Sequence, residues 1–348
     1  MAFVRNQWYV VAYSTEIGPE LFARTVLGEP LVLWRTATGE VVALADRCVH
    51  RRYPLSKGHL DGDRLICGYH GFTYEPDGRC SSVPGQHRVP RTARVPGYPV
   101  VEQDSFVWVW IGEPDKADPA AVPRAPWLAD PAYATVCGME PLAARYELLV
   151  DNLLDLSHET YLHGGYIGTP EVASTPIVTE VDAKTEVIYV SRHMDDAECP
   201  AFYARSTGLT GRITRWQDIE YHPPCLYLLH SRIAPAGSPD PAADGTDPGA
   251  FHVEVVYAIT PETEHSTHDF WAVARDFAQD DDSVSEFLAE SNRTVVLQDV
   301  AALNVLEQYI STERPGYQEL SVNIDTGGLA GRRLLADQAE RLAEQAQR

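Results

Sequence analysis

The chain has 348 residues, a formal net charge of −22 and 44% hydrophobic residues. Because that length exceeds what one hydrophobic core usually organises, we expect two globular domains in a soluble protein. The acidity argues against nucleic acid as a partner, since a phosphate backbone requires Lys and Arg on the contacting face. No secretory signal is visible at the N-terminus, and no segment approaches the roughly 18 apolar residues of a membrane span, so we expect no membrane insertion.

Residues 8–110 show the pattern of an all-β domain. Runs of β-branched and aromatic residues alternate with Gly, Pro and Asp, as expected for short strands joined by turns. Residues 112–127 are rich in Pro, Asp and Ala and are predicted to be a linker. We therefore predict one domain over residues 1–118 and a second over residues 119–348. The predicted strands of the first domain lie at residues 10–12, 31–34, 41–44 and 106–110.

Two Cys-His pairs lie within this β-rich part. One residue separates Cys48 from His50, two separate Cys67 from His70, and sixteen lie between the pairs. Two thiolates and two imidazoles can hold one Rieske [2Fe–2S] cluster, in which two Cys bind one iron and two His bind the other. A Cys2His2 zinc site uses the same atoms, but zinc fingers usually pair Cys with Cys and His with His. The interleaved pairing favours the iron–sulfur cluster.

The segment around these pairs is basic, although the protein is acidic. Positive charge beside a cluster can dock an electron donor, and solvated surface charge is the alternative. The other four cysteines show no paired spacing, so we expect reduced, apolar core residues in a cytoplasmic protein. The basic residues are Arg51, Arg52, Lys57 and Arg64, and the other cysteines are Cys80, Cys137, Cys199 and Cys225.

The second part of the chain mixes strand and helix patterns. A Pro-, Asp- and Gly-rich stretch at residues 238–249 is predicted to be a surface loop, and residues 332–347 have the apolar stripe of a terminal amphipathic helix. No glycine-rich fingerprint for a dinucleotide or a nucleoside triphosphate is visible. Strands are predicted at residues 187–191, 225–229 and 251–257, and further helices at 147–163 and 282–311.

The helix at residues 147–163 carries a second chemical signal. Asp155 and His158 are i,i+3 neighbours, and His158 and His163 can converge if the helix loosens at its end. Ferrous iron that activates O2 typically takes two His and one carboxylate. Asp299, an acid within an apolar helical run, is the candidate for the carboxylate. The alternative is that these are surface residues, or core residues whose hydrogen bonds are made within the protein. An iron–sulfur cluster in the same chain favours a metal here, because the electrons of the cluster need an acceptor.

The two signals together resemble the oxygenase component of the Rieske non-haem iron oxygenases. The family's motif N-x2-D-x2-H-x4-H is matched by Asn152, Asp155, His158 and His163, and its Rieske motif by the two Cys-His pairs. The resemblance spans nearly the whole chain, and residues 3–10 and 148–158 most resemble aromatic O-demethylases of the vanillate and dicamba type. It implies an α+β protein, in which an all-β Rieske domain precedes a helix-grip (START-like) catalytic domain with an antiparallel sheet.

The resemblance also implies roles for individual residues. The family passes electrons between neighbouring subunits of a head-to-tail homotrimer, and Asp155 corresponds to its bridge between cluster ligand His70 of one chain and iron ligand His158 of the next. Asn152 corresponds to a residue near the iron that helps to position it. The implied cluster ligands are Cys48, His50, Cys67 and His70, and the implied Fe(II) ligands are His158, His163 and Asp299.

The activity implied by the resemblance is monooxygenation of a methoxylated aromatic acid of the vanillate or veratrate type. O2 and electrons from a separate NAD(P)H-dependent ferredoxin or flavin reductase would convert the methyl ether to a phenol and formaldehyde. Ring hydroxylation, N-demethylation and oxidation of a sulfonate-linked methyl group are alternatives within the family. A Rieske electron carrier without catalysis, or a zinc-stapled binding module, are alternatives of other classes, but both would leave the second motif without a role.

The substrate side chains are expected on the strands of the second domain. Correspondence with the O-demethylases directs Leu229, Ser231 and Tyr257 to the pocket, and the strand period sends His230 and Arg232 to the other face. If the register shifts by one residue, Arg232 or His230 becomes the natural anchor for a carboxylate. For all five of these residues, the alternative is that they only pack within the sheet and bind no substrate. Relatives that bind dicamba use an amide and an imidazole where this chain has Leu229 and Tyr257, which argues against that substrate.

Overall fold

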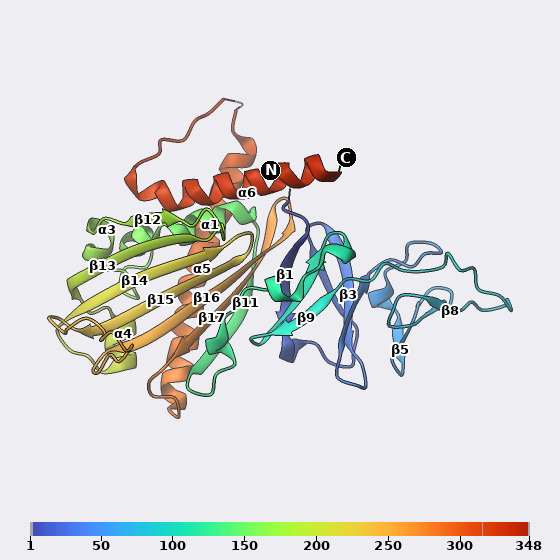
Figure 1. Cartoon of the computed structure of the whole chain (residues 1–348), viewed down its shortest axis with the longest axis horizontal. Coiled ribbons are helices and arrows are strands. Elements are labelled where there is room, and N and C mark those ends of the chain that lie inside the picture. The colour runs from blue at the N-terminus through green and yellow to red at the C-terminus, as the bar shows by residue number, and fades with distance from the viewer. Residues whose placement is uncertain (1–2, 315, 347–348) are drawn as a thin grey trace. The chain divides into compact units, whose positions relative to one another are not determined.

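The computed structural model describes residues 3–314 and 316–346, with the backbone alone for residues 342–346. The described chain divides into two compact units, each considered separately here. One unit comprises Phe3–Arg124 with Thr260–Thr263, and the other comprises Ala125–Ile259 with the chain from Glu264 onward. An all-β unit followed by an α+β unit confirms the predicted fold class (Figure 1). The boundary between residues 118 and 119 stays a prediction.

The first unit consists of three small antiparallel sheets. The four predicted strands are confirmed as parts of β1, β3, β4 and β10, and every residue of β10 is buried, as its β-branched and aromatic composition requires. The sheets are β1 (Gln7–Tyr13), β10 (Phe106–Ile111) and β9 (Val100–Gln103); β2 (Phe22–Val26), β3 (Glu29–Arg35) and β4 (Val41–Ala45); and β5 (His59–Asp61), β6 (Arg64–Ile66), β7 (Thr73–Tyr74) and β8 (Cys80–Ser82).

The second unit is built on one seven-stranded sheet. Three of its strands were predicted, but the structure extends each of them, because hydrogen bonding to neighbouring strands continues beyond the apolar run. The order is β11-β17-β16-β15-β14-β13-β12. The bounds are β11 (Ala134–Leu142), β12 (Val178–Val181), β13 (Ile188–Glu198), β14 (Arg212–His222), β15 (Leu226–Pro235), β16 (Phe251–Thr263) and β17 (Ser266–Arg275).

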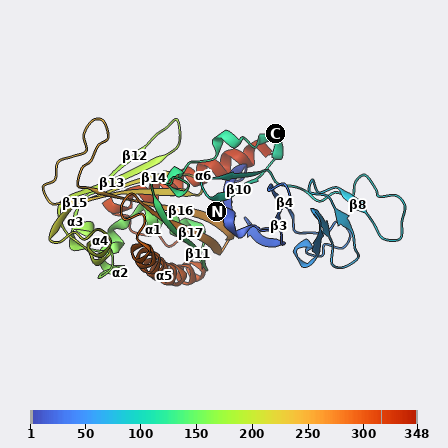
Figure 2. The same ribbon diagram turned by 90° about the horizontal axis from the view of Figure 1, so that it is seen from below.

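Two long helices pack on this sheet unit. The helix α5 (Asp282–Thr312) contacts β11 and β17, and α6 (Thr326–Ala346) contacts α1, β12 and β13 (Figures 1 and 2). The prediction of α5 is confirmed, whereas α6 begins six residues before residue 332, and Gln347 of that prediction lies outside the described residues. None of the helices in residues 3–314 and 316–346 is long and apolar enough to cross a membrane.

The prediction of a single helix over residues 147–163 is wrong. This segment instead forms α1 (Tyr146–Leu154), a 3-10 turn (Leu156–His158) and α2 (Glu159–Leu162). Asp155 causes the break, because its backbone is extended and its carboxylate accepts a hydrogen bond from the Ser157 N–H, which offers the chain an alternative to the helical ladder. Two further short helices complete the unit, α3 (Pro170–Ser174) and α4 (Ala201–Thr207).

The expectation that the four other cysteines are core residues holds for only part of the set. Cys80 and Cys225 are buried and Cys199 is partly buried, but Cys137 is exposed. Cys137 lies on β11, which forms the edge of the seven-stranded sheet and alternates between more and less exposed positions. The prediction is therefore wrong for Cys137, because its side chain shares the more exposed face of β11 with Thr135.

The start of α1 is tied to α5 through Glu307. Its carboxylate accepts hydrogen bonds from the backbone N–H, Nε and Nη2 of Arg145, at 2.7 to 3.1 Å. The carboxylate is buried, and although burial opposes ionisation, the hydrogen bonds from Arg145 and Ser311 hold the pKa of Glu307 well below its usual value. This clamp fixes the direction in which α1 runs towards residues 155–163.

We expect Glu307→Gln to lower the free energy of unfolding by about 2 kcal/mol at pH 7, because charged hydrogen bonds are stronger than neutral ones. A depressed carboxyl pKa stabilises the folded state fully above the unfolded pKa of about 4.3, and this contribution disappears as the pH falls below it. The difference between wild type and variant, measured by urea unfolding, should therefore shrink from pH 5 towards pH 3. A difference that stays constant over this range would contradict the clamp.

Candidate functional site

Cys48 and Cys67 lie in two loops of the first unit that have the same backbone design. The Cys48 N–H donates to the Tyr53 carbonyl, and the Arg52 N–H donates back to the Cys48 carbonyl. In the second loop, the Cys67 N–H donates to Phe72 and the Gly71 N–H donates to Cys67. Arg52 and Gly71 both have a left-handed φ, of 58° and 71°. Two equivalent turns therefore present two equivalent thiols.

The thiols and imidazoles of these loops differ in exposure. Cys48 and Cys67 are each 2% exposed, whereas His50 and His70 are exposed, with their ring centroids 4.6 Å apart. Burial raises the pKa of the Cys67 thiol, so an uncompensated thiolate is disfavoured and a bound cation would be needed to hold it. Two inner sulfur donors and two adjacent outer nitrogen donors fit a Rieske [2Fe–2S] cluster with its histidine-bound iron towards the surface.

Tyr74 adds a hydrogen bond to Cys48, one of the candidate cluster ligands. Its hydroxyl oxygen lies 3.1 Å from Cys48 Sγ and accepts a hydrogen bond from the Val49 N–H. A metal-bound thiolate can only accept, so Tyr74 is the donor to the sulfur. Hydrogen bonds to the sulfurs stabilise the more negative, reduced state of the cluster.

Tyr74→Phe should therefore lower the reduction potential of the cluster. A hydrogen bond of about 1 kcal/mol corresponds to about 40 mV for a one-electron couple. Redox titration followed by the visible absorption of the cluster measures this shift, and Tyr53→Phe, in the same loop, is the control. An unchanged potential in Tyr74→Phe would show that the hydroxyl does not bind the sulfur.

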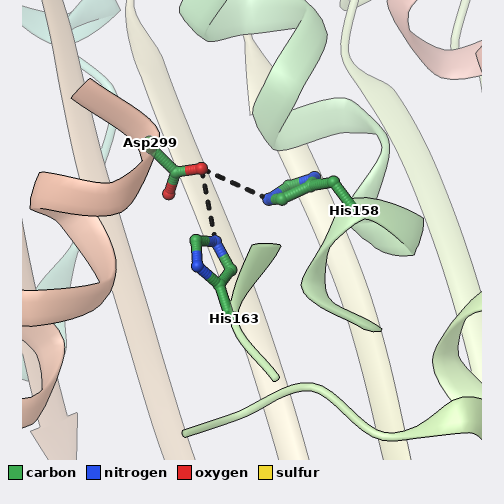
Figure 3. Close-up of side chains that lie close together, drawn as sticks. All are labelled: His158, His163 and Asp299. Atoms are coloured by element: carbon green, nitrogen blue, oxygen red, sulfur yellow. Dashed lines mark ion pairs between the residues drawn. The ribbon is translucent and has the colours of Figure 1, made fainter. Parts of the chain in front are cut away.

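Two histidines and one carboxylate converge in the second unit. Asp299 Oδ1 lies 3.3 Å from His163 Nε2 and 3.5 Å from His158 Nε2, and one ligand atom from each residue lies within 4.8 Å of the other two. Figure 3 shows both imidazoles directed at the Asp299 carboxylate of α5. His163 and Asp299 are buried and His158 is partly exposed. The helix break at Asp155 precedes both histidines, and the short helix α2 that follows it has His158 at its start and His163 at its end.

The other ring nitrogen of each histidine has its own partner. His158 Nδ1 lies 2.6 Å from the Asp155 carbonyl oxygen, and His163 Nδ1 lies 2.8 Å from Gln298 Oε1. With Nδ1 donating to these oxygens, each Nε2 keeps a lone pair for a metal. Asn152 Nδ2 donates to Asp299 Oδ1 at 3.1 Å. This set matches the two-histidine, one-carboxylate arrangement of ferrous iron sites.

The Asp155 side chain makes a different contact from the one implied by the resemblance. Its Oδ1 accepts hydrogen bonds from the backbone N–H and hydroxyl of Ser157, while its carbonyl oxygen contacts His158. The Arg192 guanidinium is 4.0 Å from the carboxylate. Within the described chain, Asp155 therefore contacts His158, a candidate iron ligand, through its backbone, and the carboxylate is held by the turn.

A cavity adjoins the triad. Leu229 and Tyr257, which the correspondence with the O-demethylases directs to the pocket, line this cavity, whereas Ser231 is buried but does not line it. Arg232 lies on the opposite face, where it binds Asp247 through two hydrogen bonds. His230, the other anchor of the alternative register, does not line the cavity either, and its Nδ1 lies 2.6 Å from Glu254 Oε2. The remaining cavity residues include Glu159, Tyr203, Arg215, Tyr227, Asn292 and Val295.

Sequence reasoning missed Arg215, although a signal was present. Arg215 and Gln217 share the strand period of Ile213, Ile219 and Tyr221, all of which are buried. A charged residue at a core position of a strand needs a partner. The helical spacing of Asn292, Val295 and Asp299 on α5 is a similar signal, since residues three, four and seven apart share one helix face.

Family models match both parts of the chain. Residues 142–341 match the vanillate O-demethylase oxygenase C-terminal domain, and residues 7–99 match the Rieske [2Fe-2S] domain. The first match covers the whole histidine–aspartate triad, and the second covers both Cys-His loops.

Curated relatives match the chain over nearly its full length. The iron-sulfur subunit of a toluene-4-sulfonate monooxygenase system from Comamonas testosteroni is 34% identical, with 96% of each chain covered. A vanillate O-demethylase oxygenase subunit from a Pseudomonas species is 36% identical over 92% of this chain and 97% of the relative.

A solved structure agrees with these sequences. Dicamba monooxygenase bound to dicamba superposes with a TM-score of 0.91 and 30% identity, covering 99% of this chain and 100% of that chain. The similarity therefore extends over both units of the protein rather than over one motif.

Proposed function

Because the chain belongs to the Rieske non-haem iron oxygenases with a vanillate O-demethylase-type C-terminal domain, we propose that it O-demethylates a methoxylated aromatic acid. The protein is the oxygenase component of a multicomponent monooxygenase, so it works with an aromatic substrate and a reductase. The observation that carries the proposal is the triad of His158, His163 and Asp299 beside an aromatic-lined cavity. Vanillate or veratrate is the preferred substrate type.

The overall reaction needs one O2, two electrons and two protons for each methyl ether. One oxygen atom enters the methyl C–H bond to give a hydroxymethyl ether, and the other leaves as water. The hydroxymethyl ether then breaks its bond between the methyl carbon and the phenolic oxygen, the hydroxyl proton moves to that oxygen, and phenol and formaldehyde are released. When bound, the mononuclear iron supplies the activation of O2, and the cluster supplies the electrons.

The chain's own residues supply position and exclusion of water. His158, His163 and Asp299 would hold the iron on one face, which leaves the opposite positions open to O2 and substrate. Gln298 and the Asp155 carbonyl orient the two imidazoles, and such partners tune ligand basicity. Leu229, Val255 and Tyr257 form an apolar wall that keeps the methoxy carbon against the iron and water away from it.

Electron delivery between neighbouring subunits is part of the proposal. A groove lined by Asn152, Asp155 and His158 opens beside the triad, with Leu306 and Leu320 on its apolar side. In a head-to-tail homotrimer, the exposed His70 of a neighbouring subunit would approach Asp155 there. Asp155 would then couple the cluster to the iron through its carboxylate on one side and its carbonyl on the other.

The cluster must also be reduced by an external donor. We propose a ferredoxin or flavin reductase that oxidises NAD(P)H and docks where Arg51, Arg52 and Lys57 are exposed around the cluster loops, because positive charge steers an acidic partner. Arg64 contributes less, since it pairs with Asp61. A cytoplasmic location is part of the proposal, because NAD(P)H would be the electron source there and thiols such as the six free cysteines stay reduced.

A second candidate function is oxidation of the methyl group of an aryl sulfonate, because the similarity to the Comamonas subunit covers nearly the whole chain. Product analysis separates the two. The protein, supplied with a reductase, O2 and either 3-methoxybenzoate or toluene-4-sulfonate, should convert the ether to 3-hydroxybenzoate and formaldehyde. Conversion of toluene-4-sulfonate to its benzyl alcohol, without demethylation of the ether, would establish the second function instead.

A further inference from the structure

Both histidines of the triad lie at the ends of the short helix α2. His158 occupies the position before its first residue, and His163 occupies the position after its last. A helix of four residues has too few hydrogen bonds to hold its own shape, because a single turn is unstable without support from the rest of the protein. The separation of the two histidines must therefore be set by contacts outside α2.

Arg215 makes such contacts at both ends of residues 158–167. Its Nη2 donates to Glu159 Oε2 at 2.8 Å, and Glu159 directly follows His158. Its Nη1 donates to the Ile167 carbonyl at 2.8 Å, four residues after His163. The side chains of Arg215 and Glu159 are only 1% and 4% exposed. Because a guanidinium offers its donors in a fixed, planar fork, one rigid group ties the beginning of the segment to its end.

Gln217 holds the other oxygen of the same carboxylate. Its Nε2 donates to Glu159 Oε1 at 2.9 Å, so that both oxygens of Glu159 are bound to side chains of β14. This strand is hydrogen-bonded along both of its edges, to β13 and to β15. The large sheet, rather than α2 itself, is therefore the rigid frame against which the segment is held.

The segment also folds tightly back on itself. The His163 N–H donates to the Glu159 carbonyl at 3.1 Å, and the Gly168 N–H donates to the His163 carbonyl at 3.2 Å. A Cβ on Gly168 would lie 1.8 Å from the Glu159 carbonyl oxygen, so only glycine fits there. A hydrogen bond of 2.6 Å from the Thr160 hydroxyl to the Thr169 carbonyl closes the same loop. A displacement of Glu159 from β14 would therefore be passed on to His163.

We propose that Arg215 and Gln217 are positioning residues of the mononuclear iron site. They hold Glu159 against β14 and thereby set the separation and direction of the two imidazoles. A functional metal site requires its ligands to be held within about 0.5 Å of the productive geometry. The inference rests on the proposed function, because it assumes that the triad binds Fe(II), and it assigns a role to two buried polar residues that do not belong to the triad.

Arg215→Lys and Gln217→Met test the proposal in the full-length protein loaded with its cluster. A lysine keeps the positive charge but cannot present the planar fork that reaches both Glu159 and Ile167, and a methionine keeps the shape of Gln217 without its donor. We expect each variant to bind Fe(II) about 10-fold more weakly in an anaerobic titration, the lower end of the range for residues that orient metal ligands. The electron paramagnetic resonance signal of the nitric oxide adduct of the Fe(II) site should also shift, because it reports the geometry of the ligands.

Arg232→Lys is the matched control. Arg232 lies on the neighbouring strand β15, is 5% exposed and binds the buried Asp247 through two hydrogen bonds of 2.6 and 2.8 Å. Its replacement should lower the melting temperature as much as Arg215→Lys does, but it should leave the Fe(II) affinity and the nitric oxide signal unchanged. A purely structural role of Arg215 would give both variants the same result.

The inference is overturned if Gln217→Met and every folded Arg215→Lys preparation keep the Fe(II) affinity and the nitric oxide signal of the wild type. It is also overturned if Arg232→Lys changes both as strongly. Formaldehyde production is not a readout here, so the proposed function can fail separately. Wild-type protein that binds Fe(II), responds to the variants as expected and still yields no formaldehyde from any methoxyarene would contradict the proposed function alone.

Discussion

Replacement of His163 by Ala is expected to abolish formaldehyde production while leaving the Rieske cluster intact. His163 is the most deeply buried member of the triad and one of its two nitrogen donors. Even partners that only orient metal ligands contribute 10- to 100-fold to affinity, so loss of a direct ligand should weaken Fe(II) binding by more than about 100-fold. Iron analysis should show the mononuclear iron missing, whereas the electron paramagnetic resonance signal of the reduced cluster should be unchanged.

His193→Ala is the control for this variant. His193 lies on β13 in the same unit, where it is exposed and pairs with Asp218, so its removal should change neither iron content nor turnover. Retention of full turnover by His163→Ala would show that the triad is not the catalytic metal site. A simultaneous loss of the cluster signal would show instead that the substitution had disturbed the whole fold.

The second large effect is expected from mixing two inactive chains. Cys67→Ser lacks a cluster and His163→Ala lacks the iron, so each protein alone should be inactive. If electrons cross between subunits of a head-to-tail trimer, co-expressed chains regain activity wherever an intact iron site faces a neighbour with an intact cluster. Random assembly from equal amounts gives about one quarter of the wild-type activity per chain.

Turnover with 3-methoxybenzoate, measured on co-purified mixed oligomers, tests this expectation. The two variants purified separately and mixed without subunit exchange are the control, and they should stay inactive. Absence of recovery in verified mixed oligomers would contradict transfer between subunits, and the route through Asp155 with it.

Many strands and helices could be predicted because runs and periods of apolar residues largely determine local structure. The run 106–110 became a fully buried strand, and the apolar period within residues 282–311 became α5. The helix over residues 147–163 was mispredicted because Asp155 binds its own turn, and this competition between side chain and backbone is hidden in an average over a window. The strand β14 was missed for another reason, because it contains no apolar run and polar residues such as Arg215 and Gln217 occupy its buried positions.

The candidate site was predictable to the extent that it rests on ligand chemistry. The histidines lie close together in the sequence, and Asp299 stands out as an acid in an apolar helical run, so the triad could be proposed from residue types alone. The rest of the cavity lining could not, because it depends on which buried side chains the fold turns towards the triad. Arg232 and Arg215 both carry a guanidinium on the same sheet, but Arg232 pairs with Asp247 away from the cavity, whereas Arg215 pairs with Glu159 and lines the cavity.

A single-turnover experiment tests the central claim most directly. The protein is reduced anaerobically until every cluster carries one electron, then exposed to O2 and 3-methoxybenzoate, and formaldehyde and 3-hydroxybenzoate are quantified per cluster. The account predicts both products in equal amounts, with a yield that rises with the fraction of chains that hold mononuclear iron. Reoxidation of the clusters without either product, in protein with full iron occupancy, would contradict O-demethylation as the function of this chain.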